Sequence, residues 1–190
     1  KTTDDFLKYR SNYENIADEE KPDNILWFIN FDINQEVPAK ISFNMILNLA
    51  SVCNAESSDI LWGFINNYYP KLKKEDSELI ERLLEYGVQY YKEFILPFKK
   101  YRQPNLKEKK GFEDLIKVLK KMLPEDNAED IQTKIYEIGM SLKFDNLKDW
   151  FSAFYQVVLG QEQGPRLGSF IKFYGINETI KLLERKINNE

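Results

Sequence analysis

The segment on which this chain is organised spans residues 159–171 and reads LGQEQGPRLGSFI. It joins two apolar patterns of helical period, residues 150–159 and residues 167–174. Gly160 suits the left-handed conformation that closes a helix, and Pro165 has the fixed φ suited to the first position of the next helix. The segment therefore predicts a helix, a tight connection and a second helix.

Arg166 follows Pro165 and is expected in the first turn of the second helix. The free N–H groups of a first turn carry partial positive charge and usually favour an acidic side chain. A basic residue beside them is accounted for if an anion, such as a nucleic-acid phosphate, binds there. The alternative is that Gly160 and Pro165 only shape the connection and that Arg166 points into solvent.

The composition limits the chemistry of the chain. Its 190 residues are 43% hydrophobic, enough for one large core or two smaller ones. No apolar run is long enough to span a bilayer and the first residues form no signal-peptide core, so we expect no membrane contact. The single Cys53 cannot form an internal disulfide and fits a reducing cytoplasm. Without histidine, His-dependent nucleophiles and Cys/His zinc sites are excluded, and we expect no catalytic and no metal-binding residues.

Apolar residues recur at helical spacing between capping residues and prolines. This pattern predicts an all-α fold, a helical bundle or cage, with two helical subdomains as one arrangement. The expected divisions are an N-terminal connecting segment at 1–40, a first helical subdomain at 41–97, a basic linker at 98–110 and a second helical subdomain at 111–190. Asn105 and Asn127 are expected to open helices, and Asp145 is expected to cap the helix that ends near Gly160.

Charge is unevenly distributed along the chain. Residues 92–110 contain seven basic and two acidic residues, a net of +5 in a chain whose total is −4, so the rest carries −9. A basic patch on an acidic body suits a protein that binds one part of a nucleic acid and is repelled by the rest. A solvated, lysine-rich helix end explains the same pattern equally well.

One aromatic residue lies among the basic ones, outside the apolar stripes. Tyr101 follows Lys99 and Lys100 and precedes Arg102. An exposed ring can stack on an unpaired base while neighbouring cations follow the phosphate backbone, a contact worth about 1–3 kcal/mol per base. These four residues, with Arg166, are the predicted RNA contacts of this half of the chain.

Two further candidates come from the first half. Trp62 lies one place off an apolar stripe and is a second stacking candidate, although a snug helix contact at Gly63 explains it as well. Asn48 interrupts an apolar helix and is a candidate reader of a base edge, whereas an asparagine bonded to a loop carbonyl is the more ordinary explanation.

Motifs from Ile41 to the end of the chain are similar in type and order to those of one family. They are Ile41-Ser-Phe43, Leu47-Asn-Leu49, Asn54-Ala-Glu56, Leu61-Trp-Gly-Phe-Ile65, Tyr90-Tyr91, Lys100-Tyr-Arg102, Ile131-Gln132, Tyr136-Glu137, Trp150-Phe151 and the 159–171 segment. In this combination the chain resembles the C-terminal part of class I lysyl-tRNA synthetases of the bacterial branch. The Gly-Pro and Leu-Gly elements are also similar to glutamyl-tRNA synthetases, whose anticodon-binding region is likewise helical.

The resemblance implies an all-α, cage-like domain that grips the anticodon stem and loop of the tRNA for lysine. It also implies a catalytic half N-terminal to Lys1, and the missing initiator Met agrees with a piece of a longer chain. The family's ATP-binding motifs, His-Ile-Gly-His and Lys-Met-Ser-Lys-Ser, are absent here. The full-length protein is therefore expected to be an ATP-using lysine–tRNA ligase of the cytoplasm, whereas these residues bind tRNA, hold no cofactor and do not charge tRNA.

Two other classes of function compete with this interpretation. A helical protein-interaction module would bind through an exposed apolar patch, and its affinity would change little with salt. An enzyme built on carboxylates alone would place two acids opposite each other in a cleft.

Overall fold

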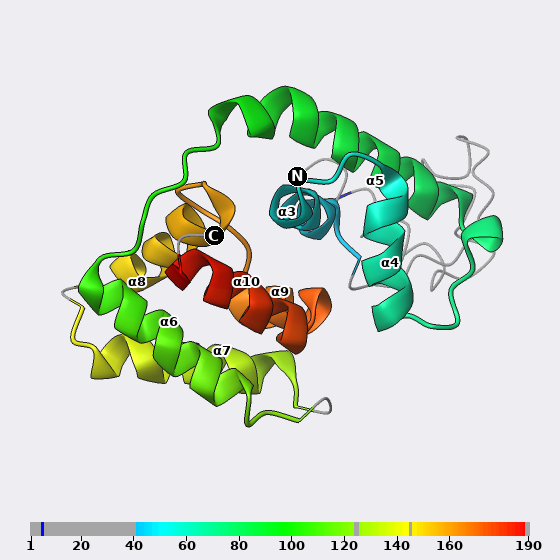
Figure 1. Cartoon of the computed structure of the whole chain (residues 1–190). Coiled ribbons are helices and arrows are strands. Elements are labelled where there is room, and N and C mark those ends of the chain that lie inside the picture. Colours follow the sequence, from blue (N-terminus) through cyan, green and yellow to red (C-terminus); the bar gives the residue numbers. More distant parts are fainter. Residues whose placement is uncertain (1–4, 6–40, 124–125, 145, 189–190) are drawn as a thin grey trace. The chain divides into compact units, whose positions relative to one another are not determined.

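The structure is a computed structural model that describes residues 5, 41–123, 126–144 and 146–188, and these form helices joined by turns (Figure 1). No strand occurs in these ranges, which confirms the predicted all-α fold. The chain divides into two compact units, Lys1–Tyr91 (unit 1) and Lys92–Glu190 (unit 2). None of the described helices is both long enough and apolar enough to cross a bilayer.

From residue 41 on, unit 1 consists of three α-helices and a short 3-10 turn. They are α3 (Phe43–Cys53), α4 (Ser58–Tyr68), η2 (Lys74–Asp76) and α5 (Glu78–Tyr90). The side chain of Ser42 caps α3 by accepting a hydrogen bond from the N–H of Met45 at 3.1 Å. Helix α5 packs against both α3 and α4, and Gly87 lets α5 approach Ile46, with which any Cβ at that position would collide.

The helical path after α5 becomes irregular before Pro97. A π-turn, η3 (Tyr91–Ile95), leads into a 3-10 turn, η4 (Leu96–Phe98), that contains this proline. Because proline cannot donate a backbone hydrogen bond and its ring clashes with the preceding turn, a regular α-helix does not continue through it. Residues 99–105 then follow without regular secondary structure.

Unit 2 contains the remaining helices. They are α6 (Leu106–Leu119), α7 (Ala128–Ser141), α8 (Leu147–Phe154), η5 (Tyr155–Leu159), α9 (Leu167–Tyr174) and α10 (Ile176–Asn188). Helix α6 packs against α7 and α10, and α7 packs against α9 (Figure 1). The buried ring of Trp150 donates from its Nε1 to the carbonyl of Ile135 at 3.1 Å, which fixes α8 on α7.

The helix starts in unit 2 follow the predicted capping residues in two places of three. Asn105 and Asn127 each form a capping box, with Glu108 and Asp130 respectively, which confirms them as helix starts. The expected cap at position 145 is wrong, because the side chain of Asn146 accepts the N–H of Lys148 at 2.9 Å and caps α8 instead.

The predicted basic linker at residues 98–110 belongs to unit 2. The N–H of Lys100 donates to the carbonyl of Gly160 at 2.9 Å, and Arg102 pairs with Glu108 in α6. The last five residues assigned to a linker, 106–110, are helical because α6 begins at Leu106. The predicted connecting segment at residues 1–40 lies outside the described residues, apart from Asp5.

Candidate nucleic-acid interface

The 160–166 connection has a defined geometry. Gly160 ends η5 with φ 69°, which confirms the predicted left-handed closure. The next helix, α9, begins at Leu167 with Arg166 as its N-cap, so Pro165 does not occupy the first helical position as expected. The carbonyl of Pro165 instead accepts a hydrogen bond from the hydroxyl of Tyr155 at 2.7 Å, which holds the connection against η5.

The first turn of α9 is closed by α7. The buried N–H of Gly168 donates to the side-chain oxygen of Gln132 at 2.8 Å. A Cβ at position 168 would collide with the carbonyl oxygen of Ala128 and with Gln132. The N–H of Gly168 therefore has a protein partner and is not offered to an external anion.

Arg166 lies on the surface at this junction. Its guanidinium pairs with Glu129 in the first turn of α7, and both side chains are more than half exposed. Ion pairs this exposed contribute about 0–1 kcal/mol, because water and salt screen them and the side chains lose entropy. Arg166 thus has an acidic partner, but one that a phosphate group could replace at little cost.

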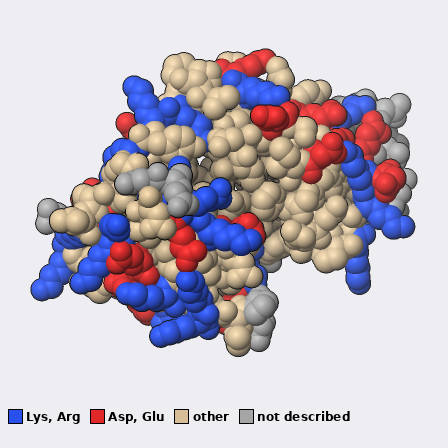
Figure 2. Space-filling model, viewed as in Figure 1, with Lys and Arg blue, Asp and Glu red and all other residues tan. Residues whose placement is uncertain are grey.

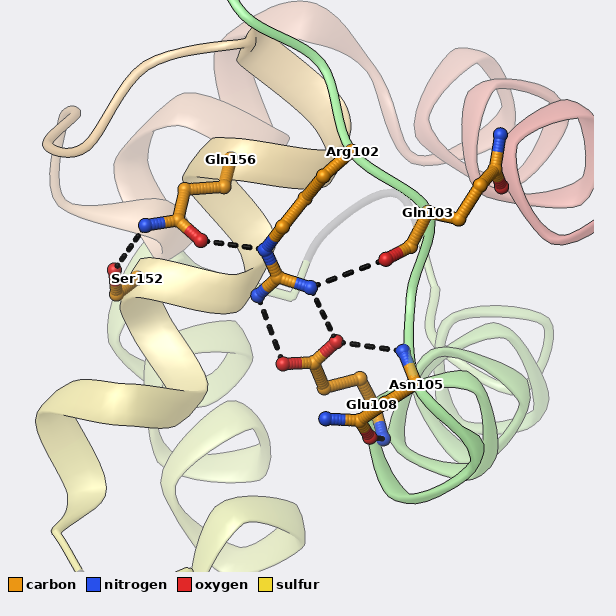
Figure 3. Close-up of polar contacts among 6 residues, drawn as sticks. All are labelled: Arg102, Gln103, Asn105, Glu108, Ser152 and Gln156. Carbon is orange, nitrogen blue, oxygen red and sulfur yellow. Dashed lines mark hydrogen bonds and ion pairs between the residues drawn. The ribbon is translucent and has the colours of Figure 1, made fainter.

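The guanidinium of Arg102 is partly exposed, yet it bonds to several neighbouring residues of unit 2 (Figure 3). Its terminal nitrogens donate to the two carboxylate oxygens of Glu108 at 2.7 and 2.8 Å, and its Nε donates to the side chain of Gln156 at 2.5 Å. A further bond reaches the carbonyl of Gln103 at 3.2 Å. Four of the five donors of a guanidinium are thereby used inside the protein. These bonds fix residues 99–105 to the rest of unit 2, and the contact of Arg102 with an RNA backbone stays a prediction.

Glu108, the partner of Arg102, is 5% exposed. Burial alone would raise the pKa of its carboxyl, but the hydrogen bonds from Arg102 and from the N–H of Asn105 outweigh burial, and the net pKa lies below its usual value. Glu108 is therefore a charged group that stabilises both the start of α6 and the segment before it.

The ring of Tyr101 is 45% exposed and lies among lysines. The ammonium nitrogen of Lys186, from the last turn of α10, lies 4.1 Å from the ring centroid, and that of Lys99 lies 5.0 Å from it. The ring also lies against Gly160, where an added Cβ would come within 3.3 Å of it. Within the reach of cation–π attraction, both ammonium groups converge on one ring. A base could stack on the ring of Tyr101 only if the contacts with Lys186, Lys99 or Gly160 were displaced.

Lys100 completes the predicted basic run. Its side chain is exposed, while its backbone N–H is bonded to Gly160. The Gly160 end of the 160–166 connection thus lies beside Lys99, Lys100 and Tyr101. Arg166 lies at the opposite end, as the N-cap of α9, and pairs with Glu129 of α7. We call the group of Lys99, Tyr101 and Lys186 the Tyr101 cluster.

Lys186 was not among the residues predicted from the sequence. In the amphipathic pattern of α10 it belongs to the polar face, and no spacing connects it with a tyrosine in a distant segment. Burial lowers the pKa of Lys186, and the neighbouring charge of Arg185 lowers it further. Within the part of the chain that the structure describes, no carboxylate pairs with Lys186.

The two candidates of unit 1 are buried. Trp62 is 3% exposed and donates from its Nε1 to the carboxylate of Glu81, and Gly63 beside it faces open space rather than a neighbouring helix. Asn48 is 6% exposed and donates to the carbonyl of Asn44, one turn earlier in α3, at 2.7 Å. A buried ring offers no face to a base, and a buried amide offers no edge. The predicted RNA contacts at Trp62 and Asn48 are therefore corrected to core positions.

Figure 2 shows Lys and Arg side chains over the α6 and α10 region, with acidic side chains among them. Several of these bases are neutralised, as in the pairs of Lys120 with Glu184 and of Lys181 with Glu178, at 2.8 and 2.7 Å. In the Tyr101 cluster the ammonium groups of Lys99 and Lys186 both lie near one aromatic ring.

Where the structure describes it, the chain is an all-α module in which two lysines lie near the ring of Tyr101. Its relatives are lysine–tRNA ligases: over 147 residues, 77% of the chain, it is 44% identical to those of Rickettsia bellii (strain OSU 85-389) and Rickettsia felis, and 42% identical to that of Rickettsia massiliae. This similarity confirms the resemblance to lysyl-tRNA synthetases. The chain spans 28% of the length of these relatives. No known protein-family model matches the chain.

Proposed function

We propose that this chain is the tRNA-binding, anticodon-recognising C-terminal part of a class I lysine–tRNA ligase. The observation that carries the proposal is the similarity to lysine–tRNA ligases, which covers most of this chain but only 28% of theirs. The chain corresponds to about a quarter of these enzymes, its described residues form helices, and it contains no histidine. These features fit a region that selects tRNA while another region of the enzyme forms the aminoacyl bond.

The electrostatics of unit 2 support this proposal. The chain as a whole is acidic, so it repels most of a polyanion, whereas Lys99, Lys100 and Lys186 lie around Tyr101 on one edge. An anticodon loop is single-stranded and exposes both phosphates and unstacked bases. A local cluster of cations and one aromatic ring suits such a loop better than it suits a regular duplex.

Catalysis belongs, in this proposal, to the rest of the full-length enzyme. The N-terminal catalytic domain of the same chain binds ATP, activates lysine and charges the tRNA in the cytoplasm. The present residues contribute selection of the tRNA for lysine and hold no cofactor.

A filter-binding titration tests the proposal. The chain is titrated with the tRNA for lysine and with the same tRNA carrying a changed anticodon, at about 50 and 200 mM salt. We expect tighter binding of the unchanged tRNA and a steep loss of affinity with salt for both. Equal affinity for the two RNAs would overturn anticodon recognition, and salt-insensitive or undetectable binding would overturn the tRNA role and favour a protein-interaction module.

A further inference from the structure

The surface of α7 carries an exposed tyrosine, Tyr136. Its ring is 42% exposed and contacts Phe151 of α8 edge to face, with the ring centroids 5.1 Å apart. Within the described ranges, no cation lies over this ring and no hydrogen bond engages its hydroxyl. An edge-to-face contact covers at most one face of a ring. Tyr136 therefore differs from Tyr101, whose ring lies against two lysines and Gly160.

Tyr155 lies close to both Tyr136 and the 160–166 connection. Its hydroxyl donates to the carbonyl of Pro165 at 2.7 Å. Burial, and to a smaller extent the neighbouring hydroxyl of Tyr136, raises the pKa of Tyr155 to about 12, so this hydroxyl stays protonated and keeps its hydrogen bond at neutral pH. Tyr136 is thus a neighbour of the residues that immediately precede Arg166.

Arg166 provides a cation on the same side of α7. Its partner, Glu129, precedes Tyr136 by seven residues, which is nearly two turns and about 10 Å along the helix axis. Positions seven apart in an α-helix lie on one face, and the side chains of Glu129 and Tyr136 are both exposed. This face of α7 therefore has an exposed ion pair at one end and an exposed aromatic ring about two turns away.

We propose that Tyr136 stacks on an unpaired base of the tRNA while Arg166 exchanges Glu129 for a phosphate of the same strand. Single-stranded RNA binds proteins through stacking on aromatic rings and through cations that follow its backbone. Two observations favour RNA as the occupant: the relatives are lysine–tRNA ligases, and the exposed pair of Arg166 with Glu129 costs little to break. This inference rests on the proposed tRNA-binding function and adds Tyr136 to the RNA-binding residues.

The decisive variant is Tyr136→Leu, with Tyr136→Phe and Tyr86→Leu as its controls. Leucine removes the flat ring, phenylalanine keeps it, and Tyr86 is an exposed tyrosine of α5 in unit 1. We expect Tyr136→Leu to bind the tRNA for lysine about five- to 150-fold more weakly, and both controls to bind as the parent does. Far-UV circular dichroism checks that the variants are folded.

Two results with these variants would overturn the inference. Unchanged tRNA binding by a folded Tyr136→Leu variant would mean that the exposed ring serves another partner, such as a protein segment. Equal losses in Tyr136→Leu and Tyr136→Phe would mean that the hydroxyl, and not the ring, makes the contact.

The salt dependence of binding separates the two contacts. Tyr136→Leu removes no charge, so its salt slope should equal that of the parent, whereas Arg166→Gln should reduce the slope by about 0.7. A slope that falls equally in both variants would mean that Tyr136→Leu acts through a lost phosphate contact, and stacking would be overturned.

Photocrosslinking of the unaltered chain needs no variant and remains decisive if Tyr136→Leu does not fold. An anticodon stem–loop RNA with photoreactive uridines in its loop is irradiated with the chain, and mass spectrometry locates the crosslinked residue. A crosslink at Tyr136 supports the inference, whereas crosslinks confined to other residues overturn it. A parent that binds no tRNA overturns both proposals, whereas a parent that binds tRNA with Tyr136→Leu unaltered overturns this one alone.

Discussion

Arg102 and Glu108 face each other fork to fork, with nitrogen–oxygen distances of 2.7 and 2.8 Å (Figure 3). Glu108 also accepts the N–H of Asn105, so one carboxylate fixes both the entering segment and the first turn of α6. The one arginine of the basic stretch at residues 92–110 therefore bonds to other residues of unit 2. Arg102 remains 39% exposed, but most of its donors have partners within the protein.

Changing Arg102 to lysine should destabilise unit 2. A lysine carries the charge but cannot form the two parallel bonds to Glu108 or the bond to Gln156. We expect the free energy of unfolding to fall by about 1–3 kcal/mol, measured by urea denaturation. The control Arg82→Lys disturbs an exposed pair with Glu78 in α5 and should change stability by less than about 1 kcal/mol. Equal stability of Arg102→Lys and the parent, with weaker tRNA binding, would favour the RNA contact of Arg102 over this structural role.

The stability contributed by Glu108 should depend on pH. The pKa of Glu108 in the folded protein lies below its usual value, so the contribution is fully present above the pKa of the unfolded chain and is lost as the pH falls through the folded pKa. We expect Glu108→Gln to be less stable than the parent at neutral pH, by about 1–3 kcal/mol, with a smaller difference near about pH 3. Urea unfolding at both pH values measures this, and Glu137→Gln, at a half-exposed pair with Lys134, is the control. A difference that is constant with pH would contradict the assignment.

Gly168 and Gly63 should respond in opposite ways to alanine. At position 168 a methyl group would meet the backbone of Ala128 and Gln132, so we expect a loss of about 1–3 kcal/mol in the free energy of unfolding. At position 63, in α4, no heavy atom lies within 4 Å of the added carbon. Alanine there should stabilise by about 0.5–1 kcal/mol, because glycine is unfavourable inside a helix. If both variants had the same thermal midpoint as the parent, the close packing of α9 on α7 would be wrong.

Arg166 can be tested through its partner. Removing the guanidinium with Arg166→Ala should weaken binding of the tRNA for lysine by about 1–3 kcal/mol if it contacts a base. Glu129→Gln should instead strengthen binding, because it frees the guanidinium from an exposed acid. Neither change should alter stability by more than about 1 kcal/mol. Filter binding at two salt concentrations measures both, and unchanged affinity in the two variants would confine Arg166 to its pair with Glu129.

Local signals in the sequence predicted the fold well. Helical periodicity and capping residues such as Asn105 and Asn127 specify structure through contacts a few residues apart, and these predictions are confirmed. The left-handed conformation of Gly160 is confirmed for the same reason. The sequence does not distinguish well between two neighbouring residues that can both cap a helix. The N-cap of α8 is Asn146, whereas the sequence predicted the residue before it.

The candidate site depended on contacts that a linear pattern does not contain. The sequence gives no reason to treat the basic residues Arg102 and Lys100 differently. In the structure, however, Arg102 pairs with the buried carboxylate of Glu108 and Lys100 does not. Trp62 lies off its stripe because its indole N–H is bonded to Glu81, a residue of another helix. Lys186 meets Tyr101 only because α10 packs against η5 and α6. Tertiary packing decides which of several similar side chains remain available to a ligand.

The hydrogen bond from the N–H of Lys100 to the carbonyl of Gly160 joins the two segments that the sequence marked separately. If the backbone at Lys100 is displaced, this hydrogen bond must break or Gly160 must move with it. The basic run and the 160–166 connection therefore share one anchoring point, the carbonyl of Gly160.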